Sequence, residues 1–551
     1  MSLPLMRQSV RCSLWLLPLA SALVATPGWA QASDEAAGIR SGRVEIRPYI
    51  EAAQVLTSEL SPGSDTVTYT RLAAGVDTAI DGRNTRGALS LRYERQIGWG
   101  KDAPDGDLVS GVARVSASLV PQKLTVEAGG IATRARFENN GGAVISPLDS
   151  SRSTGDMYAV YAGPSLRTGV GDVAVNADYR LGYTRVDTQD TIVVAPGAQR
   201  LDVFEDSLVH AASVHAGTQP GTILPVGVGV GASWYREDIS NLDQRVDDRN
   251  VRADVTVPVS GTVALVGGVG YEKIEVSNRD VRRDALGNPV IGPDGRYVTD
   301  KSSPRQISYD VDGFIWDVGV IWKPSPRTAL EAHVGRRYGG TTYYGSFAWQ
   351  NTARSNLNIS VYDSIGGLGG RVNNALVALP TDFSANRNPL TGGLGNCVGS
   401  TEEGSCLGSA LGSVRSGVFR SRGIMASYGM DLGRIQTGVA AGYDRRKFTA
   451  AQGTVLALAD GRVDENIWAA AYVNGQIDER SSFATNIYAN WFDSGFDQAG
   501  SATAFGATAA YNRLLTRRLT ATAAVGLDGF SRKALEDYWT ASALVGMRYS
   551  F

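Results

Sequence analysis

The sequence is poor in the residues that most metal and catalytic sites require. It holds only three cysteines and three histidines in 551 residues. No pair among His210, His215 and His333 has the spacing of a zinc site, and His210 and His215 would lie on opposite faces of a strand. The sequence also lacks a Gly-x-Ser-x-Gly nucleophile motif. We therefore expect no metal, no cofactor and no enzymatic activity.

An excess of charge is also missing. The chain has 53 basic and 55 acidic residues, a net charge of −2. Proteins that bind the phosphate backbone need clustered positive charge. We therefore expect no nucleic-acid partner and no polybasic lipid-surface site.

Long apolar runs are confined to residues 1–30. Basic residues precede the run Leu14–Val24, and Gly28–Ala30 supplies small residues where a signal peptidase reads. This pattern predicts a secretory signal peptide that is cleaved after Ala30. After that point no apolar run approaches the roughly 20 residues that a spanning helix requires. An exported chain of this kind can cross a membrane only as a closed β-barrel, because every backbone polar group must be paired internally.

The pattern of the carboxyl-terminal segment indicates a bacterial outer-membrane barrel. Its alternate residues are apolar, and the intervening residues are mostly polar or small; the apolar set is Tyr549, Met547, Val545, Ala543, Ala541 and Trp539. A closing strand with a terminal aromatic resembles those of bacterial outer-membrane barrels, where the assembly machinery reads the ending. We expect Tyr549 and Phe551 to serve assembly in the cell outer membrane. The alternative is an edge strand of a soluble sandwich that happens to end in Phe551.

The same period of two continues through residues 43–551. The clearest segment is Val173–Thr184, in which apolar and polar residues alternate throughout. Short turns such as Pro121–Lys123 alternate with longer stretches such as Asn278–Ser308, as periplasmic turns and external loops do in outer-membrane barrels. We expect an all-β, antiparallel up-and-down barrel of about 22 strands, within a range of roughly 18 to 22. Residues 31–42 would form a short periplasmic segment before it.

Strand parity predicts which polar side chains face the lumen. Both signs of charge occur there, together with two tyrosines that could stack sugar rings. The predicted lumen-lining residues are Arg92, Glu94, Asp178, Arg180, Glu331, His333, Arg337, Asp444, Arg446, Tyr472, Tyr488 and Arg548. A lumen lined by charges of both signs suits a path for polar or uncharged solutes. Alternatively, these charges only keep the wall hydrated. His333 beside Glu331 and Arg337 is the best candidate for a dispersed catalytic site, and a solvated ladder is the alternative.

One long segment is the candidate for narrowing the barrel. Barrels of about 22 strands in transporters hold a plug domain, and residues 31–42 leave no room for one. Residues 366–420 form the longest predicted external loop and are our candidate constriction. Cys397 and Cys406 lie in this Gly/Ser-rich stretch of an exported chain, so we expect them to form a local disulfide.

The stretch Trp316–Gly339 carries a family resemblance. It contains Trp-Lys-Pro-Ser-Pro-Arg-Thr at residues 322–328 and Gly-Arg-Arg-Tyr-Gly at residues 335–339. Over Asp310–Ser364 the sequence resembles an outer-membrane barrel family encoded beside exosortase and exopolysaccharide-export systems, of the PEP-CTERM-system-associated type. The resemblance implies an envelope and exopolysaccharide context. It implies no mechanism and no catalytic residue.

These observations together predict an outer-membrane pore or conduit for exopolysaccharide or another surface polymer. Its expected partners are outer-membrane lipid, the barrel-assembly machinery and polysaccharide-export components. A structural or assembly barrel without transport is the second hypothesis. An outer-membrane enzyme is the third.

Overall fold

The computed structural model describes residues 43–100, 103–136, 154–188, 192–193, 200–201, 206–400, 405–406, 416–495, 500–532 and 536–551. Gly42–Phe551 forms a unit of its own. The predicted signal peptide and residues 31–42 lie outside the described residues.

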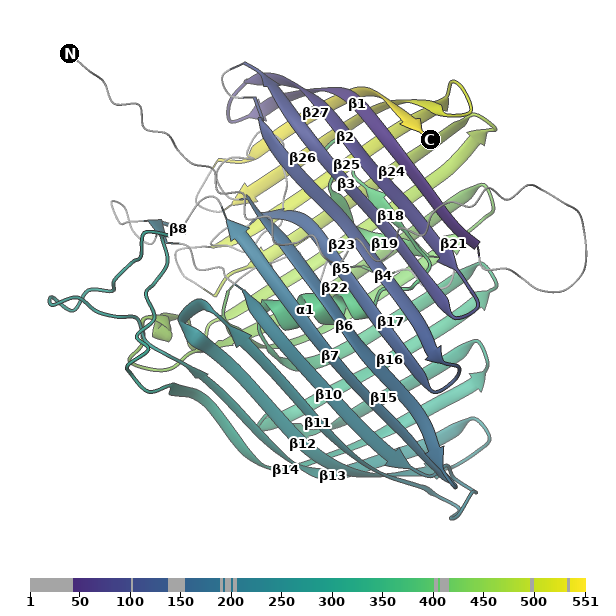
Figure 1. The fold of residues 1–551 in the computed structure, drawn as a ribbon, viewed down its shortest axis with the longest axis vertical. Coiled ribbons are helices and arrows are strands. Elements are labelled where there is room, and N and C mark those ends of the chain that lie inside the picture. Colours follow the sequence, from purple (N-terminus) through teal and green to yellow (C-terminus); the bar gives the residue numbers. More distant parts are fainter. Residues whose placement is uncertain are drawn as a thin grey trace, which may run out of the picture. The chain divides into compact units, whose positions relative to one another are not determined.

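Twenty-two strands form one antiparallel sheet (Figure 1). They are β1 (Arg43–Ser61), β2 (Thr66–Asp81), β3 (Thr85–Trp99), β4 (Gly106–Val120), β5 (Leu124–Arg136), β6 (Thr154–Val170), β7 (Val173–Thr188), β10 (Ser207–Gly217), β11 (Gly227–Ile239), β12 (Gln244–Pro258), β13 (Val263–Asn278), β14 (Gln306–Ser325), β15 (Thr328–Arg337), β16 (Gly340–Thr352), β17 (Ser355–Gly366), β21 (Val418–Asp431), β22 (Ile435–Thr449), β23 (Val463–Asp478), β24 (Ser481–Asp493), β25 (Ser501–Leu514), β26 (Leu519–Arg532) and β27 (Tyr538–Ser550).

The sheet closes on itself. Each strand pairs with its neighbour along the chain, β7 pairs with β10 and β17 with β21, and β1 pairs with β27 over a register that begins at Tyr49↔Ser550. Beyond β27, the Phe551 amide donates to the Pro48 carbonyl oxygen at 3.1 Å. The closed antiparallel barrel confirms the predicted fold class, and its 22 strands lie within the predicted range.

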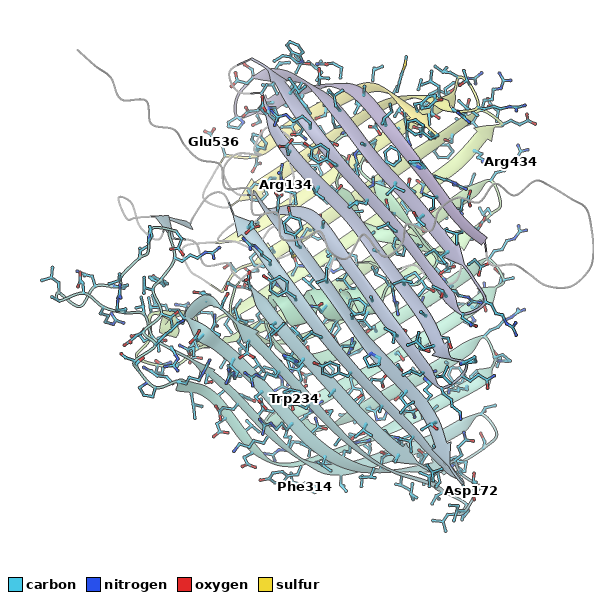
Figure 2. All side chains as sticks on the ribbon, in the orientation of Figure 1. Arg134, Asp172, Trp234, Phe314, Arg434 and Glu536 are labelled. Carbon is cyan, nitrogen blue, oxygen red and sulfur yellow. The ribbon has the colours of Figure 1, made fainter. Side chains whose placement is uncertain are left out.

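The outer surface of the barrel is apolar because alternate side chains point away from the lumen. On β27, Val545 is 70% and Met547 54% exposed, whereas Leu544, just before Val545 and on the opposite face, is 3% exposed. Phe314 on β14 is 62% exposed and carries one of the labels in Figure 2. Only lipid stabilises so much exposed apolar surface on a closed barrel. The chain is an outer-membrane protein.

Connections at the two ends of the barrel differ in length, although less regularly than the sequence predicts. Most connections at the end where β1 begins and β27 finishes are short, but residues 218–226 between β10 and β11 are longer. The opposite end carries the long stretches 279–305 and 367–417. It also carries a two-residue turn between β15 and β16, formed by Tyr338 (φ 54°) and Gly339 (φ 63°). Paired positive φ values are typical of a tight hairpin turn.

The remaining elements are small. Two further sheets contain β8 (Ile192–Val193) with β9 (Arg200–Leu201), and β18 (Phe383–Arg387) with β19 (Leu394–Ser400) and β20 (Ser405–Cys406). The described part of the chain contains the helices α1 (Leu368–Val377), η2 (Asn241–Asp243) and η3 (Val455–Ala459). Within the described ranges, no helix is long and apolar enough to cross a membrane. The sequence showed no comparable helical period, so α1 was not predicted.

Candidate functional site

The chain between β17 and β21 contacts the inner wall of the barrel on several sides. Helix α1 contacts β5, β6, β7, β10 and β17, and β18 contacts β3. In Figure 1, α1 lies behind the front wall of strands. We call residues 367–393 the inner segment. It includes α1 and β18 and belongs to the predicted loop 366–420.

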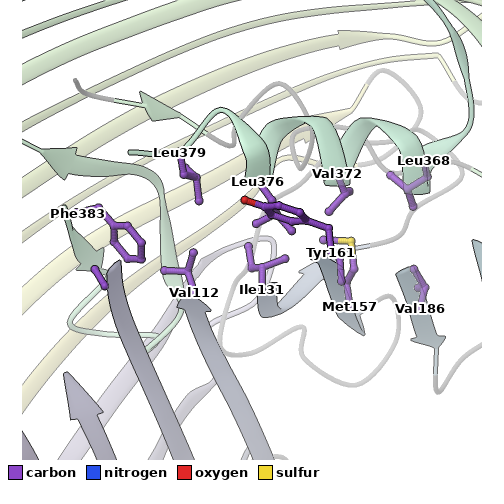
Figure 3. Close-up of a cluster of buried hydrophobic side chains, with 12 residues drawn as sticks. Val112, Ile131, Met157, Tyr161, Val186, Leu368, Val372, Leu376, Leu379 and Phe383 are labelled. Carbon is purple, nitrogen blue, oxygen red and sulfur yellow. The ribbon is translucent and has the colours of Figure 1, made fainter. Parts of the chain in front are cut away.

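Apolar contacts hold α1 against the wall. Figure 3 shows Leu368, Val372 and Leu376 of the helix facing Ile131 and Met157 of the barrel. All five side chains are at most 9% exposed. Burying a side chain of this size stabilises by roughly 1.5–3 kcal/mol. The lumen is therefore locally dry and packed where the helix lies.

A wall carboxylate binds the amino-terminal end of α1. Glu237 on β11 is fully buried and accepts the Gly367 amide at 2.6 Å and the Gly370 amide at 3.0 Å. Ser207 and Tyr235 donate their hydroxyls to the same carboxylate at 2.8 and 2.6 Å. The first amides of a helix have no partner within the helix, and its dipole favours negative charge there. Glu237 supplies both the partner and the charge.

The glycines at the start of α1 permit this close approach. A Cβ on Gly370 would lie 2.0 Å from the Tyr235 hydroxyl, and one on Gly369 would lie 2.2 Å from the Ser207 hydroxyl. Any side chain would push the helix away from Glu237. The glycine run that gives the helix its low intrinsic propensity is what lets it dock.

Asp444 and Arg446 on β22 lie together on the lumen side and bind α1. Arg371 Nη1 of the helix lies 2.7 Å from Asp444 Oδ2, and Arg446 Nε lies 2.6 Å from the same oxygen. Asp444 and Arg446 are each 1% exposed. They form a buried, charge-assisted network rather than a solvated wall ladder, so the inner segment is bonded to this side of the lumen.

The far end of the inner segment is bonded to the strands at the start of the chain. Arg71 on β2 donates to the carbonyl oxygens of Pro389 and Leu390, both at 2.7 Å. Arg387 donates to the hydroxyls of Ser110 on β4 at 2.6 Å and Ser90 on β3 at 3.1 Å. The inner segment therefore bonds to strands from both halves of the chain.

Arg92 and Glu94 belong to a cluster of four charges beneath this end. Arg92 lies 2.8 Å from Glu51 and 3.0 Å from Glu94, and Arg71 lies 3.1 Å from Glu51. Gly392 (φ +69°) sits on the cluster, and a Cβ there would be 2.4 Å from Glu94 Oε2. Positive φ and close approach both require glycine at this position.

His333 lies between two carboxylates on the lumen face. Its Nδ1 is 2.9 Å from Asp317 Oδ2, its Nε2 is 3.0 Å from Glu331 Oε1, and its ring stacks on Tyr344 at 4.7 Å. Arg252 donates two hydrogen bonds to Asp317 at 2.8 and 2.9 Å. The predicted neighbour Arg337 belongs to a different group, with Asp248 at 2.8 Å and Glu272 at 3.3 Å.

The remaining predicted lumen residues are dispersed. Tyr488 donates its hydroxyl to Asp528 at 3.0 Å. The ring of Tyr472 lies over Gly438 on the neighbouring strand, in the space that a Cβ on that glycine would occupy. Arg548 lies 2.9 Å from Asp77 and 3.6 Å above the Tyr49 ring. Asp178 and Arg180 line a cavity between the wall and α1.

The two predicted assembly residues contact each other at the end of β27. Their rings meet edge to face with centroids 5.2 Å apart, and Phe551 is 63% exposed. Tyr549 also approaches Arg518 at 3.5 Å. The terminal ring is accessible from outside the barrel.

Cys397 on β19 and Cys406 on β20 pair directly in register. Opposed residues of an antiparallel pair have Cβ atoms about 4.5–5.5 Å apart, close to what a disulfide needs. We expect the two thiols to be oxidised in the exported protein, closing a small loop that stabilises by at most about 2–3 kcal/mol. Mass spectrometry of unreduced, proteolysed protein should find the linked peptides. Full alkylation of both cysteines without prior reduction would contradict the prediction.

Some residues that organise the lumen were not predicted. Glu237 shares its strand face with Tyr235, so parity could have identified it as inward. Arg371 and Arg387 lie outside the barrel strands, where parity gives no information. Their partners, Asp444 and Ser110, lie far away in the sequence.

Neither a protein-family model nor a curated protein matches the sequence. Solved structures similar to the chain include the open form of the ferric-catecholate import receptor Fiu from E. coli K12, with 10% identity over 92% of this chain and 81% of that one, and a TM-score of 0.43. The FrpB iron transporter from Neisseria meningitidis has 10% identity over 92% and 82%, with a TM-score of 0.41. The siderophore receptor PiuA from Acinetobacter baumannii has 8% identity over 91% and 82%, with a TM-score of 0.39.

Proposed function

We propose that this protein is an outer-membrane conduit whose lumen is narrowed by its own inner segment, without a separate plug domain. The observation that carries the proposal is the bonding of this segment to opposite parts of the wall. Glu237 and Asp444 bind α1, while Arg71 binds the chain at Pro389 and Leu390. A barrel of this many strands is wide enough to enclose a channel. A segment held across it restricts passage to part of the cross-section.

The lumen wall suits a polar cargo. Charges of both signs face inward and most are paired, as Arg252 is with Asp317 and Arg337 with Asp248. A balanced wall does not strongly select ions of one sign. The resemblance of Asp310–Ser364 to barrels of exopolysaccharide systems supports a surface polymer as the cargo. Polysaccharide-export components would then be partners, beside outer-membrane lipid and the barrel-assembly machinery.

A non-transporting structural barrel is the second candidate, and the dense anchoring of the inner segment favours it. Glu237 and Asp444 are 0% and 1% exposed, so solvent does not reach either carboxylate where it binds α1. A fully sealed lumen would leave the barrel as an envelope scaffold. We propose a non-enzymatic role in either case, with His333 contributing to the polar wall.

Planar-bilayer recording tests the choice between conduit and scaffold. Purified protein should produce discrete, reproducible conductance steps, because in the proposed conduit the inner segment narrows the wide lumen without sealing it. Swelling of protein-loaded liposomes in neutral sugars of increasing size would give the exclusion limit. A heat-modifiable, folded preparation that neither conducts nor swells liposomes would support the scaffold instead.

A further inference from the structure

A cavity of about 260 Å³ lies between α1 and the lumen wall. Strands β7, β10, β11 and β12 form one side of it, residues of β15, β17 and β21 also line it, and the glycine-rich start of α1 lies against it. A cavity of this size at a polar wall suits a ligand smaller than a drug molecule. The chemistry of its lining indicates which ligand.

One row of wall residues crosses the cavity. Arg180 lies opposite Ala211, Ala211 opposite Tyr235, and Tyr235 opposite Asp248. At about 4.8 Å per strand, the ends of this row are roughly 14 Å apart at the backbone. Ala211 is the only small member of the row, so space remains beside the Arg180 side chain.

The two ends of the row offer complementary binding groups. Among the described residues, Arg180 has no ion-pair or side-chain hydrogen-bond partner. Asp248 is 5% exposed, and its Oδ1 has no hydrogen-bond partner, while its Oδ2 binds Arg337 at 2.8 Å. A buried polar atom without a partner is costly in a folded protein. A ligand that accepts from Arg180 and donates to Asp248 would satisfy both.

The neighbouring row on the same face is also polar. Ser213 lies opposite Asp178 on one side and Ser233 on the other, and all three line the cavity. Serine hydroxyls both donate and accept, which suits a ligand with several hydroxyl groups. The Tyr235 ring adds an aromatic surface against which the face of a ring can pack.

We propose that this cavity binds one acidic sugar unit, with its carboxylate on Arg180 and its hydroxyls on Asp248 Oδ1 and the serines. A neutral sugar would offer Arg180 no charged acceptor, and a simple anion would leave Asp248 without a donor. The proposal rests on the conduit function above and specifies its cargo as an acidic saccharide.

Equilibrium binding to the purified full-length protein in detergent tests the subsite without requiring conduction. Isothermal titration should show that trigalacturonate binds more tightly than the neutral match maltotriose. Arg180→Gln should weaken binding of the acidic trimer by about tenfold, the loss expected for one charge-assisted contact. Ala211→Phe fills the gap in the row and should abolish binding of the acidic trimer while leaving every charge in place. Heat-modifiable gel mobility confirms that each variant is folded.

Arg548→Gln is the matched control, because it removes a lumen arginine away from this cavity. It should bind trigalacturonate as the unaltered protein does. An equal loss in Arg180→Gln and Arg548→Gln would overturn the subsite in favour of a general charge effect. Equal affinity for the two trisaccharides, or no binding of the acidic one, would also overturn it. Binding by a protein that does not conduct would leave the subsite standing and reject the conduit.

Discussion

Removal of residues 368–416, with Gly367 joined to Gly417 by a short glycine–serine linker, is expected to raise single-channel conductance several-fold. The change takes out α1 and the chain that Arg71 and Asp444 hold, while leaving β17 and β21 complete. The wall of a barrel with this many strands encloses a wide lumen, so its open cross-section should increase greatly. Larger neutral sugars should then enter loaded liposomes.

A matched deletion in a different loop separates this effect from general disturbance. Residues 284–297 lie in the connection between β13 and β14, where Leu286 is 86% exposed. Their removal should leave conductance and exclusion limit near those of the unaltered protein. Unchanged conductance after deletion of residues 368–416, in a barrel shown to be folded, would mean that the segment does not set the pore size.

Replacement of Phe551 by Asp is expected to reduce the amount of folded barrel in the outer membrane several-fold. The Phe551 ring is 63% exposed and packs on Tyr549, so the folded barrel does not bury it in a core. Its backbone amide also bonds to Pro48, at the seam where β27 meets β1. A charge at this position removes the aromatic ending and adds an unfavourable group near the membrane interface. Membrane fractionation with heat-modifiable gel migration measures the outcome.

Leu286→Asp is the control for this change, because it places the same acid on an exposed apolar position in a loop. That variant should reach the outer membrane at normal levels. If Phe551→Asp accumulates as folded barrel just as well, the terminal aromatic has no role in assembly.

The strands could be predicted because their signal is local. Val173–Thr184 alternates residue by residue, and β7 covers it as Val173–Thr188. The turn residues between the alternating segments mark where strands end, and they therefore limit the number of strands to a narrow range. Parity also places side chains on a face, since a strand has only two. None of these inferences needs knowledge of a distant residue.

Helix α1 could not be predicted because its stability comes from the wall. Gly369 and Gly370 have poor helix propensity, and the compensating bonds come from Glu237, more than a hundred residues earlier. Likewise, parity places Asp444 and Arg446 on one face of β22. It does not predict that Arg371 of α1 forms an ion pair with Asp444. The sequence predicts which surfaces meet the lumen, and the register between strands decides which charges pair.

The inner segment differs from an independent domain in one respect that matters for the proposed conduit. Both of its ends continue directly into barrel strands, β17 and β21, so it cannot dissociate or be extracted as a unit. Any change in the opening must come from rearrangement inside the barrel, at the cost of breaking contacts such as those of Glu237 and Asp444. Since the restricting element and the wall belong to one polypeptide, they are always present in equal number. In the proposed conduit, the restricting segment is therefore not lost when a second component is missing.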